Sequence, residues 1–280
     1  MKIQLNQADI QTIVDIPADE IPVILREFCR PEQPKTKVEL APLRCRDCAL
    51  TDWRRVAEIC RNGDAAKYFE IGQMLSLHSP VWGFIEWEIA RMEKDGFWLI
   101  ARRPVCAMPF DAPELDRNGD RENIDGRDDW GSNNPLHCAT HKFLNSDAPA
   151  GEWWKASTDF DQPPEEHEQL PGFLSGLPQA FLDCVKITEV EMEIPECDGG
   201  GIEKQPLRFF LPSRQGLFPD GNRKPFFKLK TLKKDGCIWF LRSPFVGYSN
   251  IVYLVSSSGA LYNSILAHYA YGCVPACRIG

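Results

Sequence analysis

The sequence lacks the features that mark several classes of protein. It contains no run of 18 apolar residues, so we expect no membrane insertion. Its beginning has neither the apolar core nor the cleavage site of a secretory signal peptide, which predicts cytoplasmic synthesis without a standard secretion signal. The chain has fewer basic than acidic residues, with 32 Lys and Arg and 40 Asp and Glu, which gives a net charge of −8. This balance argues against a partner that is a nucleic acid.

Common catalytic signatures are missing as well. The chain has no glycine-rich phosphate loop, no Gly-x-Ser-x-Gly turn and no His-Glu-x-x-His zinc motif. Its five histidines are scattered, and none has a motif around it that nominates a general base. We therefore expect a protein that is not an enzyme, with no catalytic residue, no metal and no cofactor.

Two stretches come close to metal-binding patterns. His137 and His141 have the i, i+4 spacing of helix-borne metal ligands, and Cys45 with Cys48 could complete a zinc site. A single pair of histidines or of cysteines with such spacing is also common on ordinary helix surfaces and in cores. Most of the eleven cysteines are expected to be reduced, buried thiols, because disulfide frameworks belong mainly to short secreted chains.

The Asp-rich loop 111–129 resembles a calcium loop only in part. Alternate oxygen-bearing side chains from Asp116 to Asp120 have the required spacing. However, Arg121 stands where the sharp-turn glycine belongs, and Arg127 where the bidentate glutamate belongs. A solvated loop is the alternative, and the sequence leaves the choice open.

Hydrophobic periodicity predicts a mixed α+β domain with a small extension. Residues 1–40 are expected to be an N-terminal extension or a docking segment, with a short helix within 16–28 and a Pro- and charge-rich linker at 30–37, and the domain is expected at 41–280. Thr51 or Asp52 is expected to cap the first helix of the domain. The expected helices are 51–61, 136–145 and 178–184, and the expected strands are 73–78, 82–93, 97–108, 185–194, 207–212 and 237–244.

The region from Ser243 to Cys277 differs in composition from the rest of the chain. It contains no Asp, Glu, Lys or Arg, although 26% of the whole chain is charged, and it holds five of the six tyrosines. Tyr with Ser, Gly and Asn is typical of antibody contact loops, where a rigid aromatic ring is combined with adaptable hydrogen bonds. A buried pair of strands would also be low in charge, so composition leaves both interpretations open.

Several short motifs occur in a fixed order along the chain. They are Lys67-Tyr68-Phe69-Glu70-Ile71-Gly72, the stretches 143–154 and 172–176, Phe210-Leu211-Pro212-Ser213, Leu241-Arg242-Ser243-Pro244, and Gly272-Cys273-Val274-Pro275-Ala276. Over residues 45–280 the chain thereby resembles an uncharacterised domain that is widespread in gut bacteria and their phages. The C-terminal half resembles the C-type lectin-like fold of variable proteins that retroelements diversify.

The resemblance implies a C-type lectin-like fold, with a mixed or antiparallel sheet, two helices and long loops, and with 243–277 as the variable region. Adenine-directed mutation of the codons in such a region cannot yield Lys, Glu, Gln, Met or Trp, and none of these occurs from 243 to 277. The ligand-binding residues that the resemblance implies are Phe245, Val246, Tyr248, Ser249, Asn250, Tyr253, Tyr262, Asn263, Ile265, Leu266, His268 and Tyr269. For Phe245, Val246, Ile265 and Leu266, core packing is an equal alternative.

Three functions are compatible with these patterns. The first is a receptor-recognition protein that binds a protein or glycan on a host or neighbouring cell surface, for which a phage tail is one implied location. The second is a structural virion component that is attached through residues 1–40 and has a fixed interface. The third is a metal- or thiol-dependent enzyme, for which Cys273 and Cys277 are the best-spaced pair. No heptad run predicts a particular oligomeric state.

Overall fold

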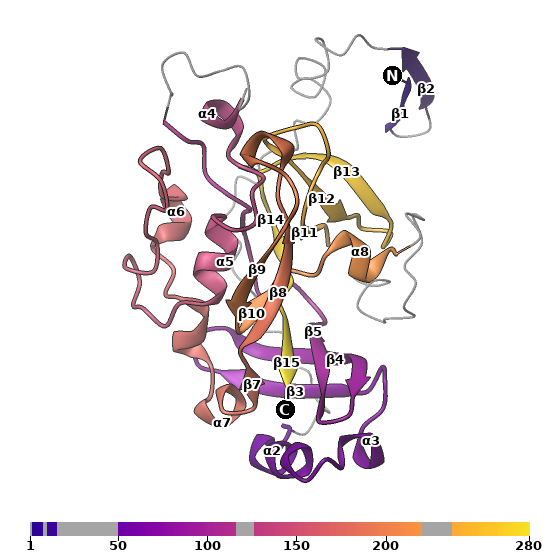
Figure 1. Cartoon of the computed structure of the whole chain (residues 1–280), viewed down its shortest axis with the longest axis vertical. Coiled ribbons are helices and arrows are strands. Elements are labelled where there is room, and N and C mark those ends of the chain that lie inside the picture. Colours follow the sequence, from indigo (N-terminus) through magenta and orange to yellow (C-terminus); the bar gives the residue numbers. More distant parts are fainter. Residues whose placement is uncertain (1, 8–9, 16–49, 116–125, 220–236) are drawn as a thin grey trace. The chain divides into compact units, whose positions relative to one another are not determined.

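The computed structural model describes residues 2–7, 10–15, 50–115, 126–219 and 237–280. The chain divides into two units, Met1–Leu43 and Arg44–Gly280. In the first unit, β1 (Lys2–Gln7) and β2 (Ile10–Asp15) form an antiparallel hairpin (Figure 1). No sequence pattern predicts this hairpin, and the helix expected within 16–28 lies outside the described residues.

The second unit is α+β, as predicted, with three sheets and short helices. Its largest sheet has six strands, all paired antiparallel, in the order β10-β15-β5-β4-β3, with β7 also paired to β15. These strands are β3 (Met74–Ser79), β4 (Gly83–Glu93), β5 (Gly96–Ala101), β7 (Val185–Lys186), β10 (Phe209–Phe210) and β15 (Ala276–Ile279). The strand β15 therefore lies inside this sheet, between β5 and β10.

A second sheet has five strands in the order β13-β12-β11-β14-β6, and β11 and β14 run parallel. Its strands are β6 (Cys106–Pro109), β11 (Trp239–Pro244), β12 (Ile251–Val255), β13 (Leu261–Leu266) and β14 (Ala270–Cys273). The third sheet is the hairpin of β8 (Thr188–Glu193) and β9 (Ile202–Leu207).

Two of the predicted strands are wrong as single elements. The range 97–108 is divided between β5 and β6, which belong to different sheets, and Pro104 between them has no N–H with which to continue a ladder. Gly272 allows the chain to pass closely there, because a Cβ on it would lie 2.6 Å from Cγ of Pro104. The range 185–194 is similarly divided into β7 and β8, which pair with different partners.

The helix α2 (Trp53–Arg61) confirms its prediction, and the Asp52 side chain accepts from the backbone N–H of Arg54 and Arg55. The helix expected at 136–145 is shorter, α5 (Ala139–Leu144), because the buried Asp111 carboxyl group accepts from the Ala139 N–H and sets its start. The other short helices are α3 (Ala65–Tyr68), α4 (Arg127–Trp130), α6 (Glu165–Glu168), α7 (Gln179–Leu182), α8 (Arg214–Leu217) and the 3₁₀ turns η2 (Phe173–Gly176) and η3 (Glu196–Asp198). Among the described residues, none of these helices has the length and apolar character needed to cross a bilayer.

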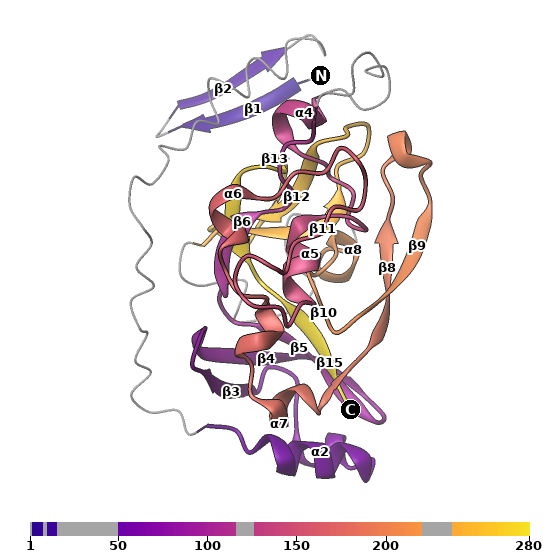
Figure 2. The same ribbon diagram turned by 90° about the vertical axis from the view of Figure 1, so that its left-hand side faces the viewer.

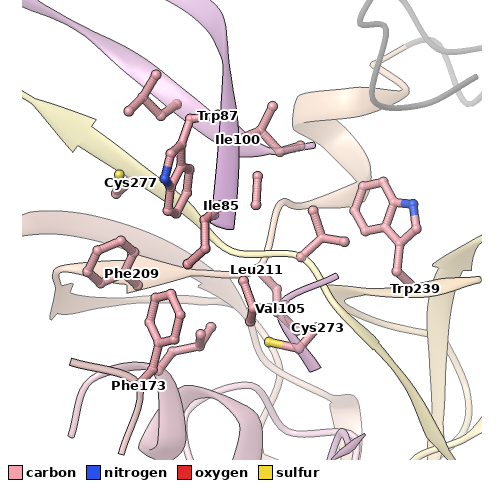
Figure 3. Close-up of a cluster of buried hydrophobic side chains, with 14 of the residues drawn as sticks. Ile85, Trp87, Ile100, Val105, Phe173, Phe209, Leu211, Trp239, Cys273 and Cys277 are labelled. Carbon is pink, nitrogen blue, oxygen red and sulfur yellow. The ribbon is translucent and has the colours of Figure 1, made fainter. Parts of the chain in front are cut away.

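The main core joins the two large sheets. Trp87 of β4 packs its ring near those of Phe181 and Phe209, and the rings of Phe173 and Phe209 meet edge to face with centroids 5.2 Å apart (Figure 3). Phe240 of β11 belongs to the same buried cluster. Within the second unit, both views place α4 at the end opposite to α2 (Figures 1 and 2).

Candidate ligand-binding surface

The charge-free region contributes to both large sheets. It contains β12, β13, β14 and the first two residues of β15, and its fully buried side chains include Val252, Val255 and Cys277. The absence of charge along these strands therefore follows from core packing. Exposed side chains of the region are found mainly in the connections between strands, and these connections are where a surface could form.

Three aromatic side chains around the β11–β12 connection form what we call the aromatic cluster: Phe245, Tyr248 and Tyr253. The Phe245 ring stacks on Tyr248 with centroids 5.4 Å apart and meets Tyr253 edge to face at the same distance. Val246 lies beside them in sequence with 68% of its surface exposed. The connection thus presents apolar surface to solvent next to rings that already contact one another.

A cation borders this cluster. The Arg214 guanidinium at the start of α8 lies 5.3 Å from the centroid of the Tyr253 ring, a distance at which a cation is attracted to the ring face. The Arg214 backbone N–H donates to Oγ of Ser243, which ties α8 to the end of β11. Burial raises the pKa of the Tyr253 hydroxyl, although the nearby Arg214 charge acts in the opposite direction.

The β13–β14 connection carries a second group of rings. The imidazole of His268 lies between Trp130, at a centroid distance of 5.0 Å, and Tyr269, at 4.2 Å. The His268 backbone N–H donates to the Trp130 carbonyl at 2.9 Å. Burial lowers the pKa of His268, which favours a neutral ring at this position.

Backbone hydrogen bonds join the two connections to each other and to residues 126–134. The Ala267 N–H donates to the Asn250 carbonyl at 2.9 Å. The Asn133 amide Nδ2 donates to the carbonyls of Tyr248 at 2.7 Å and Ile251 at 3.0 Å. Because these bonds fix the backbone on both sides of Ser249, the β11–β12 connection is held in one conformation.

Arg127 is the central residue of a buried polar network that supports the same connection. Its Nε donates to the Ser249 carbonyl at 3.0 Å, and its two Nη atoms bind both carboxylate oxygens of Asp198 at 2.9 and 2.7 Å. Asn134 donates to the same carboxylate at 2.8 Å. Only 4% of Arg127 is exposed. Burial would raise the pKa of Asp198, but the bonds from Arg127 and Asn134 and the Arg127 charge hold that pKa below its ordinary value.

The residues predicted to contact a ligand fall into separate groups. Tyr262 and Val246 are exposed, whereas Phe245, Tyr248, Tyr253, His268 and Tyr269 are partly exposed. Ser249, Asn250, Ile265 and Leu266 are buried, and the side chain of Asn263 lies outside the described residues. For Ile265 and Leu266 the core alternative holds, since both side chains are buried. Asn250 donates from Nδ2 to the Gly126 carbonyl and so supports the connection from beneath.

The two histidines of the metal-like pattern do not share a helix, because α5 begins at Ala139 and only His141 lies on it. His141 Nδ1 lies 2.8 Å from the Pro135 carbonyl, and its Nε2 accepts from the Leu211 N–H at 3.2 Å, so both ring nitrogens are engaged by backbone. Within the described ranges, no group of three or more His, Cys, Asp or Glu side chains could hold a metal ion. Cys45, Cys48 and residues 116–125 lie outside those ranges.

Sequence reasoning missed the supporting residues: Arg127, Asn133, Asn134, Asp198 and Arg214. The sequence predicts a helix from 136, directly after Asn133-Asn134-Pro135, and only the structure shows that the helix begins at Ala139, too far away for either Asn to act as its cap. Arg127 and Asp198 are 71 positions apart and share no local motif.

We compared the chain with known protein families, curated proteins and solved structures, and a family model matches it. No curated protein and no solved structure matches the chain. Residues 96–280 match a family described as Domain of unknown function (DUF6273), and this range is more than half of the chain. It includes both strand connections, Arg127 and Asp198. The chain therefore belongs to the family Domain of unknown function (DUF6273).

Proposed function

We propose that this chain is a ligand-binding protein whose contact surface is centred on the aromatic cluster. The observation that carries the proposal is that the Phe245 ring contacts both Tyr248 and Tyr253, at a connection whose backbone carbonyls accept from the buried side chains of Arg127 and Asn133. The partner is a protein or glycan on a host or neighbouring cell surface.

The physical chemistry of recognition supports this choice. Aromatic and Arg side chains dominate the binding energy of protein interfaces, and a few such anchors carry most of it. Here Tyr248 and Phe245 are partly exposed, and Arg214 supplies a charge at their border. A connection held by buried hydrogen bonds also loses little conformational freedom on binding, which favours affinity.

The finer proposal is a C-type lectin-like fold with a diversified C-terminal region. Two observations support it: the sequence resemblance, and the division of 243–277 into buried strands and partly exposed connections. Substitutions at Val246 or Tyr248 would change the surface without entering the core. Sequencing the encoding locus in many cells tests the finer proposal. It requires a near-copy of codons 243–277 whose differences are confined to adenines, and an invariant locus without such a copy contradicts it.

Binding is tested with the full chain, fluorescently labelled, against an array of bacterial and host cell-surface glycans and against intact bacterial cells. Tyr248→Ala should weaken any retained interaction by about 2 kcal/mol, roughly thirtyfold, which is the cost of losing a central aromatic anchor. Tyr68→Ala is the matched control, because Tyr68 on α3 is 55% exposed and lies outside the cluster. The proposal fails if no probe is retained, or if folded Tyr248→Ala binds as well as Tyr68→Ala.

A further inference from the structure

Two cysteines face each other across neighbouring strands of the five-stranded sheet. β6 and β14 pair antiparallel, and Cys106 lies directly opposite Cys273. The Cys106 side chain lies close enough to Cys273 to raise the pKa of the Cys273 thiol. Cys273 is 1% exposed, whereas Cys106, on the strand at the edge of the sheet, is 7% exposed. Both are reduced in this structure.

The backbone arrangement suits a disulfide. Residues directly opposite on antiparallel strands have Cα atoms about 4.5 to 5.5 Å apart, and disulfides span Cα separations of about 4.4 to 6.8 Å. Other buried thiols are engaged differently: Cys184 donates to the carbonyls of Trp53 and Ala180, and Cys138 to that of Pro135. The pairing of Cys106 with Cys273 is therefore a specific juxtaposition of two thiols.

The spacing of Cys273 and Cys277 predicted a different pair. Cys277 lies on β15 in the six-stranded sheet, and Figure 3 draws it beside Trp87, whereas Cys273 lies near Val105. The two side chains thus occupy different parts of the core. The strand register, rather than the spacing along the chain, identifies the partner of Cys273.

We propose that Cys106 and Cys273 are an oxidation site at which a peroxide forms a reversible disulfide between β6 and β14. In the first step the more accessible Cys106 sulfur attacks a peroxide oxygen, the O–O bond breaks, and hydrogen peroxide leaves one water and a sulfenic acid. In the second step the Cys273 sulfur attacks the Cys106 sulfur, the S–O bond breaks, and a second water departs. The two thiols lose two protons and two electrons in total, and the peroxide is reduced to two waters.

The environment sets the rate of the second step. Burial raises the pKa of the Cys273 thiol well above its ordinary value, and the nearby Cys106 side chain acts in the same direction. Because the thiolate is the attacking species, closure of the disulfide should be slow at neutral pH and faster as the pH rises. The finished bond would fasten the edge strand β6 to β14, which begins directly after Tyr269.

The test treats the folded, full-length protein with hydrogen peroxide, blocks remaining thiols, and analyses tryptic peptides without reduction. A linked species of residues 103–117 with 243–278 is expected, lighter by two hydrogen atoms than the two reduced peptides together. Since the second peptide also holds Cys277, Cys277→Ala should keep the linkage and Cys273→Ala should lose it. Oxidation should raise the melting temperature by on the order of 5 °C, reversibly with dithiothreitol, and have no such effect on Cys106→Ala.

Two results would overturn the proposal. One is a linked peptide that persists in Cys273→Ala or is lost in Cys277→Ala, which would assign the bond to Cys277. The other is conversion of Cys106 to sulfinic acid in the folded wild-type protein with no linked peptide at any pH tested. Should Cys273→Ala fail to fold, Cys277→Ala decides, because the linked peptide must persist in that variant if Cys273 is the partner.

Discussion

Replacing Arg127 with Met tests whether the buried network holds the second unit and its proposed surface together. The substitution keeps an unbranched side chain but removes the donors to Ser249, to both Asp198 oxygens and to the Cys197 sulfur. Removing one partner of a buried ion pair typically costs 3 to 5 kcal/mol, because the other charge is left without compensation. Because only 5% of the Arg127 side chain and 21% of the Asp198 side chain are exposed, we expect the free energy of unfolding to fall by about 3 kcal/mol.

The assay is urea unfolding of the full chain, followed by tryptophan fluorescence. Arg55→Met is the matched control, because Arg55 also forms a 2.6 Å ion pair, with Glu58, but both side chains are more than half exposed. No measurable change is expected for that variant. The double variant Arg127→Met with Asp198→Asn should recover part of the lost stability, since it also removes the stranded carboxylate. If Arg127→Met costs no more than Arg55→Met, the network does not support the fold and the reasoning is refuted.

Three further predictions concern residues beneath the surface. Burial lowers the pKa of His141 to about 4, so between pH 6.5 and 4 this histidine takes up a proton only in the unfolded chain. In an Asp111→Asn background, the free energy of unfolding should therefore fall by about 3 kcal/mol as the pH is lowered from 6.5 to 4. A free energy of unfolding, measured with urea, that is the same at both pH values would contradict this. Burial raises the pKa of Asp111 to about 8, so between pH 4 and 8 the carboxyl group ionises in the unfolded chain but not in the folded one, which destabilises the wild type. The Asp111→Asn variant lacks this effect, so its free energy of unfolding should rise relative to that of the wild type by a few kcal/mol as the pH increases from about 4 to 8. Gly131→Ala should cost roughly 1 to 3 kcal/mol more than Gly199→Ala in the same assay. Both glycines have positive φ, but only at Gly131 would the new Cβ meet backbone, 2.6 Å from the Asp111 carbonyl; equal costs would argue against the clash.

Local patterns predicted the elements whose causes are local. Asp52 and the apolar spacing from Trp53 to Cys60 predict α2 correctly, because capping and amphipathicity operate within a few residues. The break at Pro104 was missed, although Arg102-Arg103-Pro104 interrupts the apolar run 97–108, because only tertiary pairing assigns its halves to different sheets. Propensity carries no information about which sheet a strand joins.

The candidate surface was predictable only in part. Low charge distinguished 243–277 from the rest of the chain, but the same composition describes the buried side chains of Ile265 and Leu266 and the exposed Val246. Burial depends on which face of a strand meets the core, and the register shift between β12 and β13 alters that relation along the hairpin. The pairing of Arg127 with Asp198 joins distant segments, so no window of sequence could reveal it.

The position of β15 has a consequence for synthesis. Because Ala276–Ile279 lies between β5 and β10, the six-stranded sheet cannot close until the ribosome has translated codon 279. Until then β5 has an unpaired edge, a feature that favours aggregation of incomplete chains. A premature stop codon within 243–275 should therefore give an aggregated or degraded product rather than a shortened binding protein. A variant with an altered surface can therefore fold only if its gene keeps the reading frame through codon 279.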